Sequence, residues 1–170
     1  MSGGSLTLVL GGARSGKSRH AEGLVAEHSA PWLYLATGQA FDAEMEERIR
    51  HHRDRRDERW HTIDAPLDLC AALDAAPEGR PVLIDCLTLW LSNHMLAGHD
   101  VEAESERLCA RLAAPRGPWV AVSNEVGLGI VPDNALARAF RDAQGRLNQR
   151  VAAVASGVLF MAAGLPMKLK

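Results

Sequence analysis

The sequence predicts an α/β fold with a mostly parallel central sheet and helices on both faces. Short buried apolar runs alternate along the chain with stretches of helical periodicity, which is typical of strands joined by crossover helices. The 170 residues fit one domain, residues 1–170, because domains usually have roughly 100–200 residues. A glycine-rich turn between the first strand and the first helix then indicates which kind of α/β fold to expect.

That turn is Gly11-Gly12-Ala13-Arg14-Ser15-Gly16-Lys17-Ser18, with the G-x-x-x-x-G-K-[ST] spacing of a phosphate-binding loop. Residues 6–10 predict the strand that enters it, and residues 18–28 predict the helix that leaves it. Glycines let several backbone N–H groups face one phosphate, and the N-terminus of the helix adds positive charge. We therefore expect a P-loop NTPase fold of the RecA-like type.

Two side chains of the loop have predicted chemical roles. Lys17 would reach the β- and γ-phosphates of a nucleotide, and the Ser18 hydroxyl would hold Mg²⁺. Only three of the nineteen Lys and Arg residues are lysines, at positions 17, 168 and 170. A chain that uses lysine so rarely still places one in the loop, where arginine is no equivalent of a compact ammonium group. Lysine usage therefore supports a catalytic role for Lys17.

The second predicted strand, residues 32–36, ends in Thr37-Gly38-Gln39. Polar residues at the carboxyl end of a buried parallel strand lie on the ligand side of the sheet. The same three residues also suit a plain turn from strand to helix. Both interpretations stay open from these residues alone.

A helix is predicted from Asp42, its N-cap, to about Arg56. Charges of both signs, such as Glu44 four residues before Arg48, are typical of a solvated helix face. The same segment contains the pair His51-His52 with arginines on both sides. Such a cluster suits a polyphosphate, and histidine titrates near neutral pH. A solvated face and a functional histidine are both compatible with this segment.

Residues 60–64 predict a short edge strand, and residues 67–75 a short helix. Residues 82–86 then form an apolar strand that includes Asp85. A carboxylate at the end of such a strand is the expected partner of a phosphate loop, because it holds the Mg²⁺ shell. Asp85 would also serve as the N-cap of a helix over residues 87–96, and the two roles are compatible.

The rest of the chain predicts a helix over 101–113, a strand over 119–123, a glycine-bearing loop over 127–132, a helix from Asn134 to about 155 and a closing strand over 158–162. Lys17, Thr37, Asp85 and Asn124 each follow a predicted strand. The carboxyl ends of parallel strands share one edge of the sheet, where open α/β sheets bind ligands. We therefore expect these four side chains at one rim.

The composition of the chain argues against several classes of protein. A net charge of −2 provides no general basic field for nucleic acid. The three cysteines have no close spacing, so they predict neither a disulfide framework nor a zinc site and favour a reducing, cytoplasmic setting. The first residues predict no secretory signal, and no apolar run is long enough to span a membrane.

Seven stretches of the sequence carry a resemblance to a known family: residues 11–22, 33–39, 42–45, 48–53, 124–132, 145–149 and 164–170. Together they resemble the bifunctional adenosylcobinamide kinase/adenosylcobinamide-phosphate guanylyltransferases of cobalamin biosynthesis. The phosphate loop alone is generic, whereas the histidine pair combined with residues 124–132 is specific. The resemblance implies phosphorylation of adenosylcobinamide by ATP or GTP, followed by transfer of GMP from GTP onto adenosylcobinamide phosphate.

The resemblance also implies the site residues. The first histidine of the pair, here His51, would carry GMP covalently. The implied nucleotide contacts are Gly11–Ser18, Thr37, Gly38, Gln39, His52, Arg53, Asp54, Arg55, Asp64 and Asp85. Such enzymes are homotrimers with sites near subunit interfaces. Some members have Glu where this chain has Asp64 and Asp85, which shortens the reach of each carboxylate by one methylene, and the stretch between residues 93 and 119 is short.

Two other functions are compatible with a phosphate loop. A single-function small-molecule kinase would use the same loop and need no covalent histidine. A GTP-binding regulatory module would be expected to read guanine with an N-K-x-D motif, and no lysine lies between Lys17 and Lys168.

Overall fold

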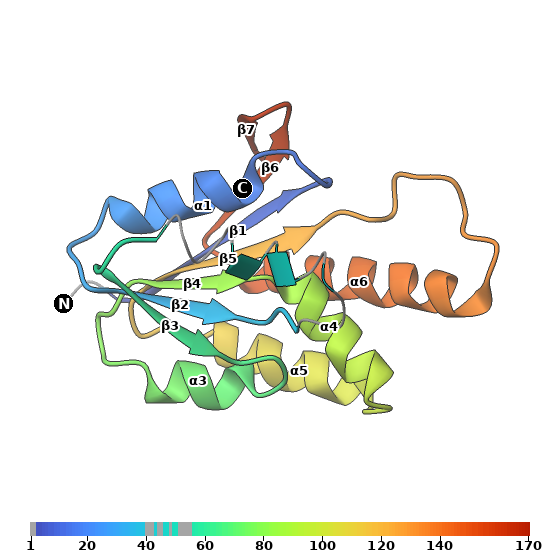
Figure 1. The fold of residues 1–170 in the computed structure, drawn as a ribbon, viewed down its shortest axis with the longest axis horizontal. Coiled ribbons are helices and arrows are strands. Elements are labelled where there is room, and N and C mark those ends of the chain that lie inside the picture. The colour runs from blue at the N-terminus through green and yellow to red at the C-terminus, as the bar shows by residue number, and fades with distance from the viewer. Residues whose placement is uncertain (1–2, 40–42, 44–45, 48, 51–55) are drawn as a thin grey trace.

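A seven-stranded sheet forms the centre of the computed structural model, which describes residues 3–39, 43, 46–47, 49–50 and 56–170 (Figure 1). The strands lie in the order β3-β2-β4-β5-β1-β6-β7. Their bounds are β1 Ser5–Gly11, β2 Trp32–Ala36, β3 Trp60–Asp64, β4 Val82–Asp85, β5 Pro118–Asn124, β6 Gly157–Ala162 and β7 Leu165–Lys168. All pairings are parallel except β6–β7, so the prediction of a mostly parallel sheet is confirmed.

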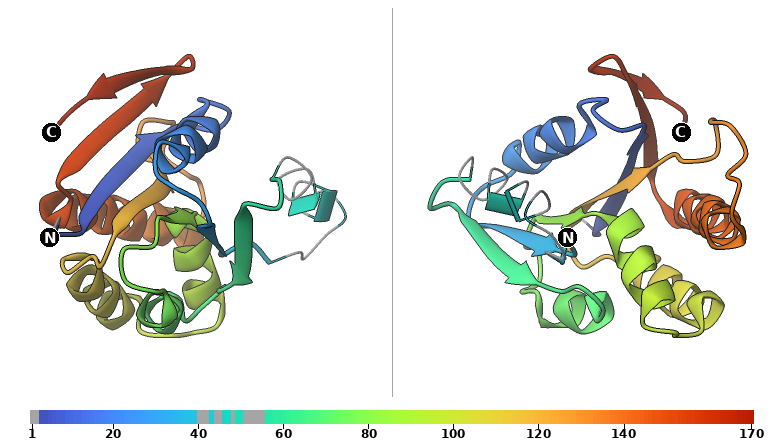
Figure 2. Two further views of the ribbon diagram at one scale, coloured as in Figure 1. Left: turned by 90° about the vertical axis from the view of Figure 1, so that its left-hand side faces the viewer. Right: turned by 45° about the vertical axis from the view of Figure 1, so that its right-hand side comes forward.

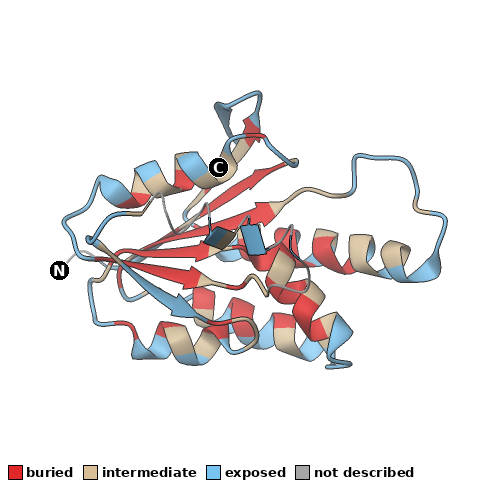
Figure 3. Cartoon of the chain, in the orientation of Figure 1, coloured by how far each residue is buried: buried red, intermediate tan, exposed pale blue. Residues whose placement is uncertain are grey.

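Helices cover both faces of the sheet (Figures 1 and 2). Their bounds are α1 Lys17–Ala26, α3 Leu69–Ala75, α4 Leu87–Leu96, α5 Val101–Leu112 and α6 Ala135–Val154. On one face Ala21 and Val25 of α1 pack against the sheet. On the other face α3, α4, α5 and α6 bury a larger cluster that includes Trp90 and Leu147. The central strands are buried on both faces (Figure 3), as expected for strands covered by crossover helices.

The order of the strands decides which predicted site residues lie near one another. β5 lies between β1, which leads into the phosphate loop, and β4, which ends in Asp85. In register, Gly11 pairs with Asn124, and Asp85 pairs with Val122 on β5 and with Ala36 on β2. The carboxyl ends of these four strands therefore meet at one edge, as the sequence predicted.

Of two helix caps predicted within the described residues, Asn134 is confirmed and Asp85 is wrong. The Asn134 side chain accepts a 2.8 Å hydrogen bond from Ala137 N and begins α6. α4 is capped by Cys86, whose Sγ accepts from Leu89 N, and not by Asp85. The helix predicted from Asp42 to about Arg56 falls mostly outside the described residues, although Glu46, Glu47 and Arg50 are helical.

The structure adds a strand that the sequence analysis left out. β6 turns back through Ala163 and Gly164, with φ of 51° and 78°, into antiparallel β7. Positive φ at both central residues is the geometry of a two-residue hairpin turn, for which glycine is favoured. Pro166 lies within β7 because an edge strand tolerates the loss of an N–H donor. Gly164 before the short run Leu165–Lys168 was the signal available in the sequence.

Candidate active site

The phosphate loop joins the end of β1 to the start of α1. A Cβ at Gly11 would lie 2.5 Å from Ser15 Oγ, so only glycine fits there. Gly16 has φ +90°, in the left-handed region that glycine adopts without strain. α1 begins at Lys17, and the first N–H groups of a helix have no acceptor within it. The loop therefore has the backbone of an anion site.

Lys17 lies over this loop. Its Nζ donates a 2.9 Å hydrogen bond to the Gly12 carbonyl oxygen, which folds the side chain back across the turn. Partial burial lowers the pKa of Lys17, and the nearby Cys86 and Asp85 side chains oppose that shift. Lys17 and Asp85, predicted from separate parts of the sequence, are thus brought together. The Cys86 thiol is no competing nucleophile, because burial raises its pKa to about 12.

Asp85 is oriented by a tyrosine on the neighbouring strand. Tyr34 Oη donates a 2.8 Å hydrogen bond to Asp85 Oδ2. Burial, with the Asp85 charge as a second cause, raises the pKa of Tyr34 far above its ordinary value. The phenol therefore stays protonated and remains a donor that holds the carboxylate at the rim.

The donor set near the loop fits Mg²⁺. Asp85 supplies a carboxylate and Ser18 a hydroxyl, and Mg²⁺ is usually held by one or two carboxylates together with substrate phosphates and water. Within the described ranges no three His, Cys, Asp or Glu side chains gather closely enough to bind a metal by themselves. A site in which the phosphates of a nucleotide also bind the ion does not need three protein ligands.

Replacing Asp85 with Asn should lower turnover by about 10²-fold or more, because the neutral amide keeps the shape of the side chain but is a much weaker ligand for the Mg²⁺ that neutralises phosphate charge. The melting temperature should change by only a few degrees, since an amide oxygen still accepts from Tyr34. Activity per folded molecule and thermal unfolding should be measured together. A collapsed melting temperature with normal activity of the folded fraction would make Asp85 structural.

Thr37 ties two strand ends together. Its fully buried Oγ1 donates to Cys86 O at 2.7 Å and accepts from Cys86 N at 2.8 Å. Its carbonyl oxygen accepts from Asn93 Nδ2 at 2.8 Å. Because the Thr37 hydroxyl both donates and accepts a hydrogen bond, it fixes the ends of β2 and β4 relative to each other at the rim. Gly38 and Gln39 follow it, partly exposed, at the predicted edge.

Asp64 lies farther along the same rim. It is the exposed last residue of β3, beside Ala36 of β2, whose other neighbour is Asp85. Two strand spacings of about 4.8 Å place the backbones of Asp64 and Asp85 about 10 Å apart. Asp64 and Asp85 thus lie on either side of the end of β2.

A buried polar network holds the end of β5. Asn148 Oδ1 accepts from Ser123 Oγ at 2.6 Å and from Gln144 Nε2 at 2.9 Å, and Asn148 Nδ2 donates to Asn124 O at 3.0 Å. Thr88 Oγ1 accepts from Asn124 N at 2.8 Å. The sequence analysis placed Asn124 at the rim but missed the network that fixes it. Asn148 is only 5% exposed, and its side chain makes its hydrogen bonds within the chain.

Asn148→Ala should destabilise the fold by roughly 1–3 kcal/mol, because it leaves buried partners without hydrogen bonds. Urea unfolding measures this difference. The matched control is its exposed neighbour, Gln149→Ala, which should change stability by about 0.5 kcal/mol or less. Equal stabilities of the two variants would contradict a structural role for the network.

Arg56 is a second residue that the sequence analysis did not include in the site. Its guanidinium lies 3.6 Å from the centre of the Tyr34 ring, on the tyrosine that holds Asp85. Arg56 Nε and Nη1 are buried and make no hydrogen bond to any residue that the structure describes. The pattern of arginines around residues 50–56 was the available signal, but which arginine stacks on Tyr34 depends on the tertiary structure.

Five predicted site residues lie outside the described part of the chain: His51, His52, Arg53, Asp54 and Arg55. Their roles remain those implied by the sequence. Among the described helices, none combines the length and hydropathy that a membrane crossing requires.

Comparison with known proteins identifies the family. The model of the family described as cobinamide kinase / cobinamide phosphate guanyltransferase matches residues 7–169. The chain belongs to this family. It is 48% identical over 166 residues to the bifunctional adenosylcobalamin biosynthesis protein CobP of Pseudomonas aeruginosa, with 96% of each chain covered. It is 42% identical to the Salmonella typhimurium bifunctional adenosylcobalamin biosynthesis protein CobU, covering 97% of this chain and 99% of that one.

Membership of the cobinamide kinase / cobinamide phosphate guanyltransferase family makes the chain a nucleotide-using transferase of cobalamin biosynthesis. Solved structures support the fold separately. A Pyrococcus horikoshii protein has a TM-score of 0.57 at 10% identity, covering 100% of this chain and 88% of that chain. An ATPase of a bacterial type III secretion system has a TM-score of 0.55 at 13% identity, covering 98% and 57%. The P-loop NTPase fold predicted from the loop is thereby confirmed.

Proposed function

We propose that the chain performs two successive transfers at one phosphate loop. The first phosphorylates the aminopropanol hydroxyl of adenosylcobinamide with ATP or GTP. The second transfers GMP from GTP to adenosylcobinamide phosphate, giving adenosylcobinamide-GDP and pyrophosphate. The observation that carries this proposal is the convergence of Lys17 and Asp85 at a complete phosphate loop, in a chain that matches the family over residues 7–169.

In the first transfer the loop holds the triphosphate and Lys17 stabilises charge on its outer phosphates. A bond forms between the γ-phosphorus and the hydroxyl oxygen, the bond to the β-phosphate oxygen breaks, and the hydroxyl proton is released. Such a reaction needs positioning and charge neutralisation more than covalent chemistry. When bound by Ser18 and Asp85, Mg²⁺ would neutralise further charge on the phosphate oxygens.

In the second transfer His51 is the proposed nucleophile. A neutral imidazole nitrogen attacks the α-phosphorus of GTP, and pyrophosphate leaves. The resulting histidine–GMP bond then breaks as a phosphate oxygen of adenosylcobinamide phosphate attacks the same phosphorus. Histidine suits this role because its ordinary pKa of about 6.5 leaves much of it neutral at pH 7.

The remaining nucleotide contacts are proposed from the family pattern. They comprise the loop residues Gly11–Ser18, then Thr37, Gly38, Gln39, His52, Arg53, Asp54, Arg55, Asp64 and Asp85. Positions of Asp64 and Asp85 on the two sides of β2 support a nucleotide laid across that strand end. We further propose a homotrimer acting in the cytoplasm; the three free cysteines suit a reducing compartment.

The test is incubation with adenosylcobinamide and GTP, with product masses determined. Adenosylcobinamide-GDP and pyrophosphate are expected. A parallel incubation with GTP labelled on the α-phosphate should give acid-labile, base-stable label on the protein. Phosphorylated adenosylcobinamide without protein label would favour the alternative, a single-function kinase. The absence of any corrinoid product would refute the proposal.

A further inference from the structure

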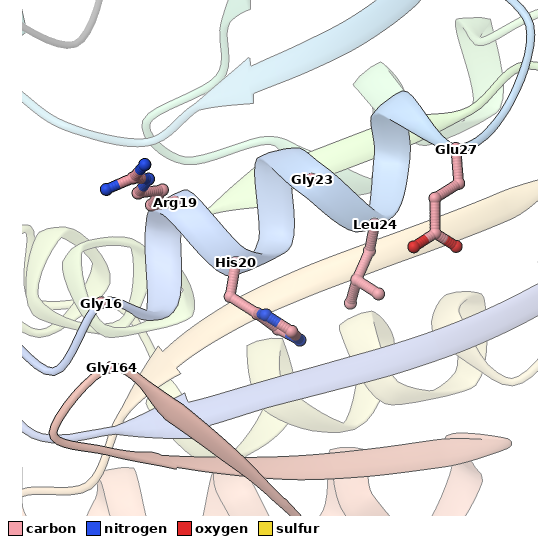
Figure 4. A pocket seen from close by; sticks show the side chains of 7 residues that line it. All are labelled: Gly16, Arg19, His20, Gly23, Leu24, Glu27 and Gly164. Atoms are coloured by element: carbon pink, nitrogen blue, oxygen red, sulfur yellow. The ribbon is translucent and has the colours of Figure 1, made fainter.

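A hollow of about 450 Å³ opens beside the phosphate loop, between α1 and the β6–β7 hairpin (Figure 4). Its lining consists of Gly16, Arg19, His20, Gly23, Leu24, Glu27 and Gly164. Its lining belongs to α1 and to the turn that follows β6, whereas the nucleotide contacts that the family pattern implies outside the loop lie toward β2, β3 and β4. From β4 to β6 is three strand spacings, or about 14 Å. The hollow and those contacts are therefore on opposite sides of the loop.

The hollow is directly continuous with the loop. Gly164 N donates a 3.0 Å hydrogen bond to Ser15 O, which fastens the hairpin turn to the phosphate loop. Gly164 Cα lies 3.3 Å from where a Cβ of Gly16 would be. Because Gly16 and Gly164 have no side chains, the two backbones lie close together at this junction. The hollow therefore begins directly beside the phosphate loop.

One face of α1 forms the wall. The lining residues from Gly16 to Glu27 span eleven positions, or about 16 Å at 1.5 Å per residue. That length exceeds what a ribose and a base need. The volume also falls within the roughly 300–1,000 Å³ typical of small-molecule sites.

The side chains of this wall can contact both the flat face and the N–H groups of a nucleoside base. His20, Leu24 and Glu27 point from α1 toward the strands of the hairpin (Figure 4). Gly23, between them, leaves open space, since a Cβ there would meet nothing within 4 Å. Leu24 and the His20 ring offer surface to the flat face of a base, and the Glu27 carboxylate accepts hydrogen bonds from ring or exocyclic N–H groups.

We propose that this hollow receives the ribose and base of the nucleoside triphosphate that donates the phosphoryl group. The inference rests on the proposed function and extends it: one loop holds the phosphates in both reactions, while the nucleoside lies on a different side in each. During phosphorylation the nucleoside lies along α1, and during GMP transfer it lies over the ends of β2 and β4. Each reaction thereby presents a different phosphorus, γ or α, to its acceptor.

The decisive variant is Gly23→Leu, which adds a bulky side chain at a lining position where a Cβ would meet nothing within 4 Å. Leucine is also a better helix former than glycine, so the melting temperature should not fall. The KM for the triphosphate in adenosylcobinamide phosphorylation should rise about tenfold or more, a loss of about 1.4 kcal/mol. Protein labelling from α-labelled GTP should stay at the wild-type level.

Two controls accompany it. Gly23→Ala adds only one methyl group and should leave the KM nearly unchanged. Gly145→Leu makes the same substitution on α6, where a Cβ again meets nothing within 4 Å, and should leave both reactions unchanged. A wild-type KM in folded Gly23→Leu would overturn the inference. A parallel loss of phosphorylation and labelling would overturn the separate placement of the two nucleosides.

Binding of adenosine 5′-(β,γ-imido)triphosphate or its guanosine counterpart, measured by calorimetry, separates this inference from the proposed function. It needs no corrinoid. If the wild-type protein phosphorylates no adenosylcobinamide, the proposed function fails, and the hollow is still tested by the affinity of Gly23→Leu. Weakening by about tenfold for at least one analogue supports the nucleoside site; unchanged affinity for both overturns it.

Discussion

Lys17→Ala should abolish both the kinase and the guanylyltransferase reactions. The ammonium group lies over the phosphate loop, bonded to Gly12 O and close to Asp85. Removing a preorganised charge from a phosphoryl-transfer site costs on the order of 10²–10³ in rate, and here the loop is shared by both reactions. Corrinoid phosphorylation and protein labelling from α-labelled GTP should be measured on the same preparation.

Two further variants sharpen the Lys17 test. Lys17→Arg should not rescue activity, because a planar guanidinium does not replace a compact ammonium group in the loop. Lys168→Ala removes an exposed lysine of β7 and should leave both reactions near wild type. Near-normal kinase turnover in Lys17→Ala would refute the idea of one shared loop.

His51→Ala should lose the α-phosphate label and all transfer of GMP to adenosylcobinamide phosphate. Without the nucleophile no covalent nucleotide forms, whereas phosphorylation of the hydroxyl needs only positioning and charge neutralisation. Kinase activity should therefore persist in part. The measurements are labelling, kinase turnover and folding by circular dichroism.

The matched variant is His52→Ala, which should keep the label and weaken only GTP binding. On the helix that the sequence predicts from Asp42 to about Arg56, neighbouring residues would point about 100° apart, so the two imidazoles would rarely address the same phosphorus. Persistence of the label in folded His51→Ala, or its loss only in His52→Ala, would reverse the assignment.

Local patterns predicted most of the fold because its central strands, β1, β2, β4 and β5, are largely buried. Residues 82–86 contain the observed β4, and residues 119–123 lie within β5. β7 escaped prediction because its residues Leu165–Lys168 are exposed. A strand of only four exposed residues that includes Pro166 has no strand pattern to reveal it.

The rim was predictable for a different reason. Asp85 and Asn124 end β4 and β5, Lys17 begins α1 after the loop that follows β1, and parallel strands present their carboxyl ends at one edge. The partners that hold these residues were not predictable in the same way. Tyr34, a buried strand residue like its neighbours, becomes the donor to Asp85 only because β2 and β4 are adjacent.

The sequence by itself determined the phosphate loop, the alternation of strands and helices, and the resemblance that names the chemistry, because each depends on residues close together in the chain. The tertiary structure decided what depends on distant segments meeting. It placed β5 between β1 and β4, stacked Arg56 on Tyr34 and used the Thr37 hydroxyl to join two strand ends. It also fastened Gly164 of the hairpin to the loop at Ser15, forming the hollow along α1. These contacts are set by strand order and packing, which no short stretch of sequence contains.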